Sequence, residues 1–235
     1  MGAALSSHGL DPQHRELLAE YIGHSIKTLE ECAQIFRGPL GRDGDDDDEY
    51  DEGARSKRFR PDVVAYPRHL RFAQFEEVFG MLVADVDPHF EFFLDADEDD
   101  GSDSVQNLVC AHQVFCAIAL VANADLHAKI TFILRLYTDA VGQLSVGKTR
   151  VAIHDFLLAL QLVLNLADEI PSDVVRAIED AFGREDDSKL VSVRDVYDIC
   201  FTTATISGYL HVIHALVDET LATAYTDCGF GNHNV

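Results

Sequence analysis

A lysine that follows two glycines is the first feature of this chain that could carry chemistry. Residues 142–149 read GQLSVGKT and match the pattern Gly, four residues, Gly, Lys, Thr of a phosphate-binding loop. Such a loop needs a buried strand before it, a helix after it and a parallel sheet around it. The residues after Thr149 have helical spacing and supply no such sheet. A nucleotide-binding enzyme that uses 142–149 is therefore the less favoured alternative, and no catalytic residue is assigned.

A run of carboxylates is the second feature with chemical potential. Asp95, Asp97 and Asp99 are spaced two residues apart, and Asp103 follows shortly after. Carboxylate oxygens at this spacing are ligands for a hard cation such as calcium. A solvated acidic loop is the simpler interpretation, because no glutamate follows where a bidentate ligand is needed. These four aspartates are the candidate metal ligands.

The beginning of the chain carries a modification signal. Met1, Gly2 and Ser6 satisfy the pattern for N-myristoylation, which places the acyl chain on Gly2. One myristoyl chain binds a membrane only marginally, and no basic cluster or cysteine lies nearby. We therefore expect attachment to the cytoplasmic face of a membrane that also depends on a protein partner.

Composition excludes several classes of function. The formal net charge of −23 opposes binding to nucleic acid. Five cysteines without regular spacing predict neither a disulfide framework nor a zinc finger, which indicates a reducing, cytoplasmic compartment. No apolar stretch reaches the length of a membrane span.

Apolar residues recur at helical spacing through most of the chain. Ile153, Phe156 and Leu160 define one stripe, and similar stripes predict helices elsewhere, including 12–21 near the start and 208–224 near the end. The strand-like pieces are very short and are found at 69–72, 103–106, 142–146 and 189–193. Residues 38–67 differ from the rest, because an acidic run is followed by a basic one, and they are predicted to be a solvated insertion.

The short strand-like pieces recur between pairs of predicted helices. Leu70, Val105, Leu144 and Val191 mark them at intervals of about 35 to 47 residues. Helix, loop with one strand residue, and helix is the unit of an EF-hand, in which the apolar residue at loop position 8 pairs with that of a neighbouring hand. On these residues the chain resembles a four-EF-hand protein of the calcineurin-B and neuronal-calcium-sensor kind.

The resemblance does not extend to the calcium ligands. Counting from the marker residues places Gln74, Lys148 and Asp195 at position 12 of the first, third and fourth loops, where calcium requires a bidentate glutamate. The second loop keeps the aspartates at 95–103, but Val105 lies too far from Asp95 for a standard loop. A calcium sensor with one irregular site at 95–103 is the first alternative function.

The sequence therefore predicts an all-α fold of two EF-hand pairs with minimal two-stranded links, plus N- and C-terminal helices. The expected divisions are 1–25 (lipidation segment and helix), 26–124 (first pair, with the insertion 38–67), 125–206 (second pair) and 207–235 (C-terminal helix and tail).

The function expected from the resemblance is that of a non-catalytic, myristoylated adaptor or regulatory subunit in signalling. Its apolar groove would hold an amphipathic helix of a phosphatase, kinase, transporter or cyclase, without a required cofactor and without calcium. The C-terminal helix is expected to occupy this groove when no partner is bound. The candidate groove residues are Phe90, Phe93, Phe115, Ile153, Phe156 and Leu160.

Overall fold

The protein is mostly helical, as expected from its apolar periodicity. The computed structural model describes residues 12–38, 66–94, 107–139, 141–164, 171–182 and 186–227, with side chains omitted at residue 12 and at 220–227. The helices are α1 (Pro12–Glu20), α2 (Ile26–Arg37), α3 (Phe72–Phe79), α4 (Asp87–Phe93), α5 (Ala111–Val121), α6 (Leu126–Leu136), α7 (Val146–Leu164), α8 (Ser172–Phe182), α9 (Val193–Thr202) and α10 (Ala204–Asp227), with 3₁₀ turns η1 (Tyr21–Gly23) and η2 (Gly80–Leu82). The strands are β1 (His69–Leu70), β2 (Val109–Cys110), β3 (Gln143–Ser145) and β4 (Leu190–Ser192).

The short strands pair in twos, each antiparallel. In one pair Leu144 lies opposite Val191, and in the other Leu70 lies opposite Val109. The expected marker Val105 was therefore wrong, because the strand lies four residues later and the predicted piece 103–106 falls outside the described residues. Val109 is fully buried and begins β2, directly before α5. Its burial, rather than local spacing, therefore decides that it pairs with Leu70.

Local signals explain where several helices begin and end. Ser25 and Asp125 accept hydrogen bonds from the N–H groups of Thr28 and Ala128, and so cap α2 and α6. Gly38 follows α2 with φ 69°, a backbone conformation that glycine adopts without steric cost. The last helix begins at Ala204, four residues before its predicted start, because the chain turns sharply at Thr203.

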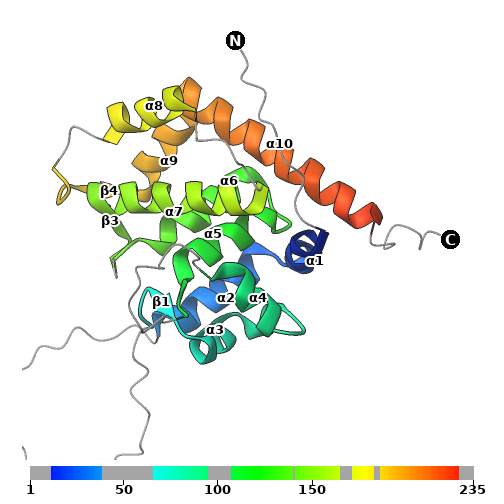
Figure 1. Ribbon diagram of the computed structural model, residues 1–235. Coiled ribbons are helices and arrows are strands. Elements are labelled where there is room, and N and C mark those ends of the chain that lie inside the picture. The colour runs from blue at the N-terminus through cyan, green and yellow to red at the C-terminus, as the bar shows by residue number, and fades with distance from the viewer. Residues whose placement is uncertain are drawn as a thin grey trace, which may run out of the picture.

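The helices build two halves that share a core. In the first half Phe75 packs against Phe79 and Phe90, with ring centroids 4.9 and 5.4 Å apart. In the second half α6, α7, α8 and α9 surround a second apolar centre. The longest contact between the halves runs along α5 and α7, which lie side by side through the middle of the molecule (Figure 1).

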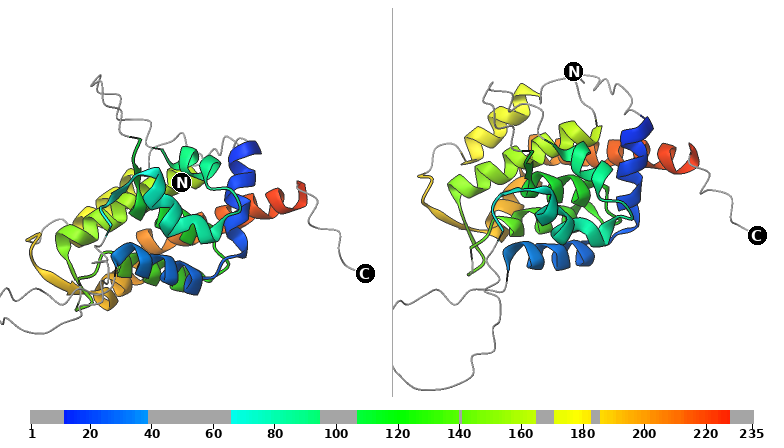
Figure 2. Two further views of the ribbon diagram at one scale, coloured as in Figure 1. Left: turned by 90° about the horizontal axis from the view of Figure 1, so that it is seen from below. Right: turned by 60° about the horizontal axis from the view of Figure 1, so that its bottom comes forward.

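The terminal helices pack on this body and on each other. Helix α10 runs along α8, α9, α7 and α5, and α1 crosses it near its C-terminal half (Figures 1 and 2). The predicted lipidation site Gly2 and most of the insertion 38–67 lie outside the described residues.

A buried carboxylate also joins the two halves. Asp155 on α7 accepts two hydrogen bonds from one nitrogen of Arg68, at 2.7 and 2.6 Å, and one from the Tyr137 hydroxyl at 2.8 Å. Arg68 precedes β1 in the first half, whereas Tyr137 directly follows α6 in the second. Three donated hydrogen bonds offset the cost of burying this charge.

Candidate functional site

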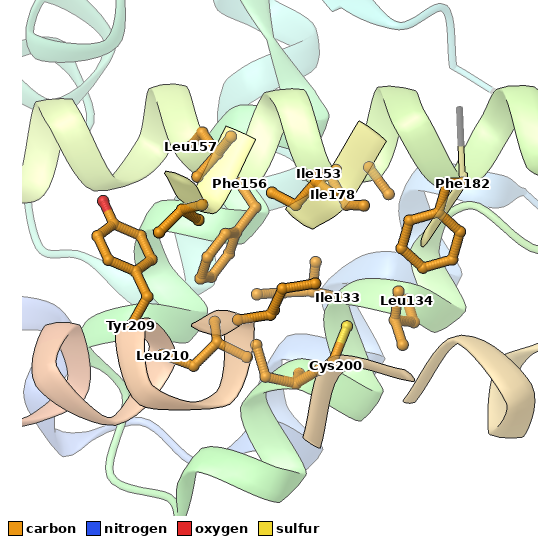
Figure 3. A pocket seen from close by; sticks show the side chains of 14 residues that line it. Ile133, Leu134, Ile153, Phe156, Leu157, Ile178, Phe182, Cys200, Tyr209 and Leu210 are labelled. Carbon is orange, nitrogen blue, oxygen red and sulfur yellow. The ribbon is translucent and has the colours of Figure 1, made fainter. Parts of the chain in front are cut away.

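An apolar cavity lies in the second half of the molecule, among the described residues. It has a volume of about 50 Å³ and lies between α6, α7, α8, α9 and α10 (Figure 3). Its lining residues are Ile130, Ile133, Leu134, Ala152, Ile153, Phe156, Leu157, Val174, Ile178, Phe182, Cys200, Ile206, Tyr209 and Leu210. A cavity lined in this way is expected to be dry and to accept apolar groups only.

Each helix contributes the residues of one face to the cavity. On α7 the contributing residues Ile153, Phe156 and Leu157 are three and four positions apart, which is the spacing of one side of a helix. Figure 3 shows Phe156 pointing from α7 toward Leu210 of α10, with Tyr209 beside it. The cavity is therefore closed by residues distant in sequence, and α8 and α10 supply six of its lining residues.

The two titratable groups of the lining stay neutral. Burial raises the pKa of the Cys200 thiol to about 11, and burial also raises the pKa of Tyr209. A thiol with so high a pKa is a poor nucleophile at neutral pH. A lining of this kind favours an apolar side chain over a charged group.

Helix α10 sits on this site by one face. Ile206, Leu210, Ile213 and Val217 are nearly or fully buried at intervals of three and four residues, whereas Val212 is 49% exposed. This is the pattern of an amphipathic helix lying on an apolar groove. We call the surface that receives this face of α10 the helix groove. It is formed by α6–α9 around the cavity and is continued by α5 and α1.

A buried ammonium lies close to the same helix. Lys129 of α6 donates a hydrogen bond from Nζ to the Leu120 carbonyl oxygen at 2.6 Å and is only 2% exposed. Burial lowers the pKa of Lys129, while the nearby carboxylates of Asp218 on α10 and Asp125 act in the opposite direction. When α10 is packed in the helix groove, the Asp218 carboxylate therefore lies near the buried Lys129 ammonium and helps to stabilise its charge.

The six residues predicted to form the groove divide between the two halves. Ile153 and Phe156 line the cavity, and Leu160 is buried one turn further along α7. Phe90 and Phe93 instead pack in the first half, around Phe75. Phe115 belongs to α5 and contacts Phe79 of the first half and Phe132 of α6.

Residues of α8 complete the site in a way the sequence only partly indicated. Helical spacing allows an apolar stripe through Val175, Ile178 and Phe182, but Val174 is the buried residue and Val175 is 37% exposed. Two adjacent valines satisfy the same periodicity almost equally well. Only packing against α7 and α10 decides between them.

The predicted metal ligands Asp95, Asp97, Asp99 and Asp103 lie outside the described residues. Within the described ranges, no group of three or more His, Cys, Asp or Glu side chains could hold a metal ion. The register of β1 and β2 bears on the calcium alternative, because Val109 lies four residues further from Asp95 than the assumed Val105. That loop is thus longer than the sequence count had assumed.

Several backbone N–H groups of the phosphate-loop match already donate hydrogen bonds to other groups of the protein. Gln143 donates to the Asp139 carboxylate, and Val146 and Gly147 donate to the carbonyl oxygens of Lys189 and Asp187. The N–H of Lys148 donates to the Ser145 hydroxyl. A phosphate cradle needs these N–H groups free to point at the ligand.

The two glycines of the phosphate-loop match, Gly142 and Gly147, have structural roles. Gly142 has φ 82° and makes the tight turn before β3. A Cβ at Gly147 would lie 3.3 Å from both Cβ and the carbonyl oxygen of Asp187, so glycine permits close packing against the turn before β4. The only strand hydrogen-bonded to β3 in the described residues is β4, and no parallel sheet surrounds the glycines there.

No family model, curated protein or solved structure matches this chain. Among the described residues, no single helix is long and apolar enough to cross a bilayer. Helices α9 and α10 reach that length and composition only when taken together, across a bend of 86°.

Proposed function

We propose that the chain is a non-catalytic adaptor or regulatory subunit of EF-hand-like construction that grips an amphipathic helix of a partner protein. The order of elements supports this, because β1, β2, β3 and β4 each lie between two helices and pair in twos. In an EF-hand pair the strand of each loop joins that of its neighbour in the same way. Such pairs commonly present an apolar groove to a helix.

The observation that carries the proposal is the amphipathic helix already seated on the helix groove. Helix α10 buries one apolar stripe there and leaves the opposite side, including Val212 and His211, exposed. A partner helix with apolar residues at the same intervals would make equivalent contacts. Displacement of α10 then becomes the step that switches binding on.

That exchange exposes the buried stripe of α10, so a partner helix must cover the same apolar surface in return. Helix α10 is joined to α9 through the single residue Thr203, and its release also breaks its contacts with α5 and α1. A partner must bind more tightly than the tethered helix, whose attachment gives it an advantage of effective concentration. The cavity shows that α10 fills the groove incompletely, which leaves room for a better-fitting side chain.

Calcium is not part of the proposed mechanism. At position 12 of the fourth loop, Asp195 accepts hydrogen bonds from both the N–H and the hydroxyl of Ser192, which lower its pKa. At position 12 of the first loop, the Gln74 side chain accepts from the Arg71 N–H. Both side chains serve as helix caps rather than facing a cation.

Membrane attachment remains part of the proposal through the sequence signal at Gly2. An acyl chain there would give marginal, reversible affinity for the cytoplasmic face of a membrane, and a bound partner would have to add to it. The partner would then be a signalling protein of that surface, of the phosphatase, kinase, transporter or cyclase class. Mass measurement of the protein from a myristoylating host tests this, and an unmodified Gly2 would remove the membrane from the proposal.

A labelled peptide tests the groove directly. The chain contains no tryptophan, so a peptide copying residues 204–227 with tryptophan in place of Tyr209 is the sole indole in the mixture. We expect its fluorescence to shift to shorter wavelength on binding the variant Ile213→Ala/Val217→Ala, in which the chain's own helix is loosened. Binding should be at least tenfold weaker to the unsubstituted chain.

A second peptide, with serine in place of Ile206, Leu210 and Ile213, is the matched control and should not bind. Circular dichroism establishes that the loosened variant remains helical. If that folded variant binds neither peptide, or binds both equally, the groove is only a packed core and the adaptor proposal fails.

A further inference from the structure

Two neighbouring clefts gather positive charge on one face of this acidic protein. The first, of about 540 Å³, is lined by Arg37, Thr131, Arg135, Thr138, Gly142, Val193, Arg194 and Tyr197. The second, of about 590 Å³, is lined by Arg68, His112, Leu136, Tyr137, Thr138, Ser145, Gly147, Lys148, Val151, Asp187 and Ser188. Because Thr138 belongs to both, we treat them as one surface and call it the basic face.

Arg68 is paired with the buried Asp155 carboxylate, but the other positive charges of the basic face are poorly balanced by the residues around them. Among the described residues, no carboxylate pairs with Arg37 or Lys148. Arg135 and Arg194 have only long contacts to Glu30 and Asp198, at 3.8 and 3.9 Å, between exposed side chains. Such pairs contribute little. Asp187 is the one acidic lining residue, and it is already paired with Arg150 at 2.5 Å.

Arg37 is the most constrained of these cations. Its side chain donates to the Arg135 carbonyl oxygen at 2.5 Å, so the end of α2 is held against α6. Burial lowers the pKa of Arg37, which means that its charge is partly removed from water. A guanidinium in this position is stabilised by an anion that reaches it.

The connectivity of the chain brings one anion source to this face. Residues 39–65 leave the described structure at Gly38, directly after Arg37, and re-enter at Tyr66, two residues before Arg68. The Tyr66 N–H donates to the Phe36 carbonyl oxygen at 2.9 Å, so both ends of this segment meet at the end of α2. The segment begins with an acidic stretch, residues 43–52, of sequence DGDDDDEYDE.

We propose that the basic face is a binding site for a carboxylate-rich peptide, and that its occupant is this chain's own acidic stretch, residues 43–52. The proposal rests on charge and connectivity and is independent of the helix groove. An arginine guanidinium can bind a carboxylate through two parallel hydrogen bonds. The basic face offers such guanidinium groups on three elements, α2, α6 and α9. Attachment at Gly38 makes the encounter intramolecular, with an effective concentration in the range of millimolar.

An acidic peptide added in trans tests this assignment. The probe is a fluorescent peptide of residues 41–53, titrated by anisotropy at low salt into the full chain and into a full-length variant with Asp45, Asp46, Asp47 and Asp48 replaced by asparagine. We expect the neutralised variant to bind the probe at least tenfold more tightly, since its own stretch no longer competes. Binding should weaken steeply between 50 and 300 mM salt.

Matched charge variants locate the site. Adding Arg135→Gln/Arg194→Gln to the neutralised variant should weaken probe binding at least fivefold; these side chains are 62% and 88% exposed, so the fold is not at risk. Lys27→Gln/Arg176→Gln removes the same charge from exposed positions away from the face and should leave probe affinity within twofold.

Three results would overturn the proposal. Equal affinity for the unsubstituted and neutralised chains means that the face is open to an acidic segment of another protein and that the chain's own stretch does not occupy it. Binding unchanged by Arg135→Gln/Arg194→Gln places the probe elsewhere, for example on the basic run at 55–60. The absence of binding to the neutralised chain means that the face is no acidic-peptide site.

Discussion

The carboxylate of Asp155 lies completely buried where the two halves of the molecule meet. It receives the Arg68 guanidinium from one half and the Tyr137 hydroxyl from the other. Removing one partner of such an arrangement leaves the other partners desolvated and unpaired, which costs more than the contact itself contributes. Asp155 is thus a structural residue, and its role is to align the halves.

We expect Asp155→Asn to lower the free energy of unfolding by about 2–3 kcal/mol, because the amide cannot accept from Arg68 and Tyr137 as the carboxylate does. Urea denaturation measures this. Asp187→Asn is the control, since its ion pair with Arg150 involves a carboxylate side chain that is 68% exposed and should cost below about 1 kcal/mol. Equal losses in the two variants would contradict a special role for the buried carboxylate.

His112 makes stability depend on pH in a direction that can be worked out. Burial, and then the neighbouring charge of Arg68, lower the pKa of His112 to about 4. The unfolded state, with an ordinary pKa near 6.5, binds the proton more readily. Stability contributed by neutral His112 is therefore complete above about pH 6.5 and is lost as the pH falls toward 4, by about 3 kcal/mol.

The measurement is the free energy of unfolding of the unsubstituted chain and of His112→Gln between pH 7 and pH 4. We expect the difference between the two curves to change by about 3 kcal/mol over that interval. His154→Gln, at an exposed position, should follow the unsubstituted curve. A constant difference between the unsubstituted chain and His112→Gln would show that His112 does not titrate as described.

Among the elements, α10 illustrates how adjacent residues of one helix differ. Ile213 is 1% exposed and faces the groove, whereas Val212 is 49% exposed and faces solvent. We expect Ile213→Ala to destabilise α10 by about 2–4 kcal/mol through lost burial and the cavity left behind, and Val212→Ala to change stability by less than about 0.5 kcal/mol.

Hydrogen exchange locates this effect. Amides of α10 and of α8, which α10 covers, should exchange faster in Ile213→Ala, while those of α2 and α3 should be nearly unchanged. Uniformly faster exchange along the chain would show that α10 and the body unfold as one unit. Displacement of α10 by a partner would then be too costly to serve as a switch.

The elements were predictable to different degrees. The stripe of Ile153, Phe156 and Leu160 located α7, and the apolar residues Leu144 and Val191 located β3 and β4. The second strand was misplaced because several valines follow the acidic run at 95–103, and local spacing cannot tell which of them pairs with Leu70. Its pairing is decided by a partner strand about forty residues away.

The charge of the whole molecule opposes its compactness. A formal charge of −23 repels itself, and added salt screens that repulsion. We expect the midpoint of thermal unfolding to rise by several degrees between 20 and 300 mM KCl. A fall over this range would mean that favourable ion pairs such as Arg68–Asp155 contribute more than the general repulsion removes.

What the sequence determined by itself is local in origin. Helical stripes, capping residues such as Ser25 and Asp125, and short strands depend on neighbours within a few positions, so an all-α fold could be predicted from spacing alone. The amphipathic character of α10 was also predictable. Of the residues beneath it, Ile153 and Phe156 were named as groove residues from the sequence, whereas those of α8 and α9 were not.

The tertiary structure alone decided which of these faces meet. It placed Phe90 and Phe93 in one half and Phe156 in the other, joined Arg68 to Asp155 across 87 positions of sequence, and gathered Arg37, Arg135 and Arg194 in one cleft. The physical reason is that burial and charge pairing depend on distance in space. Residues far apart in sequence become neighbours only after the helices have packed.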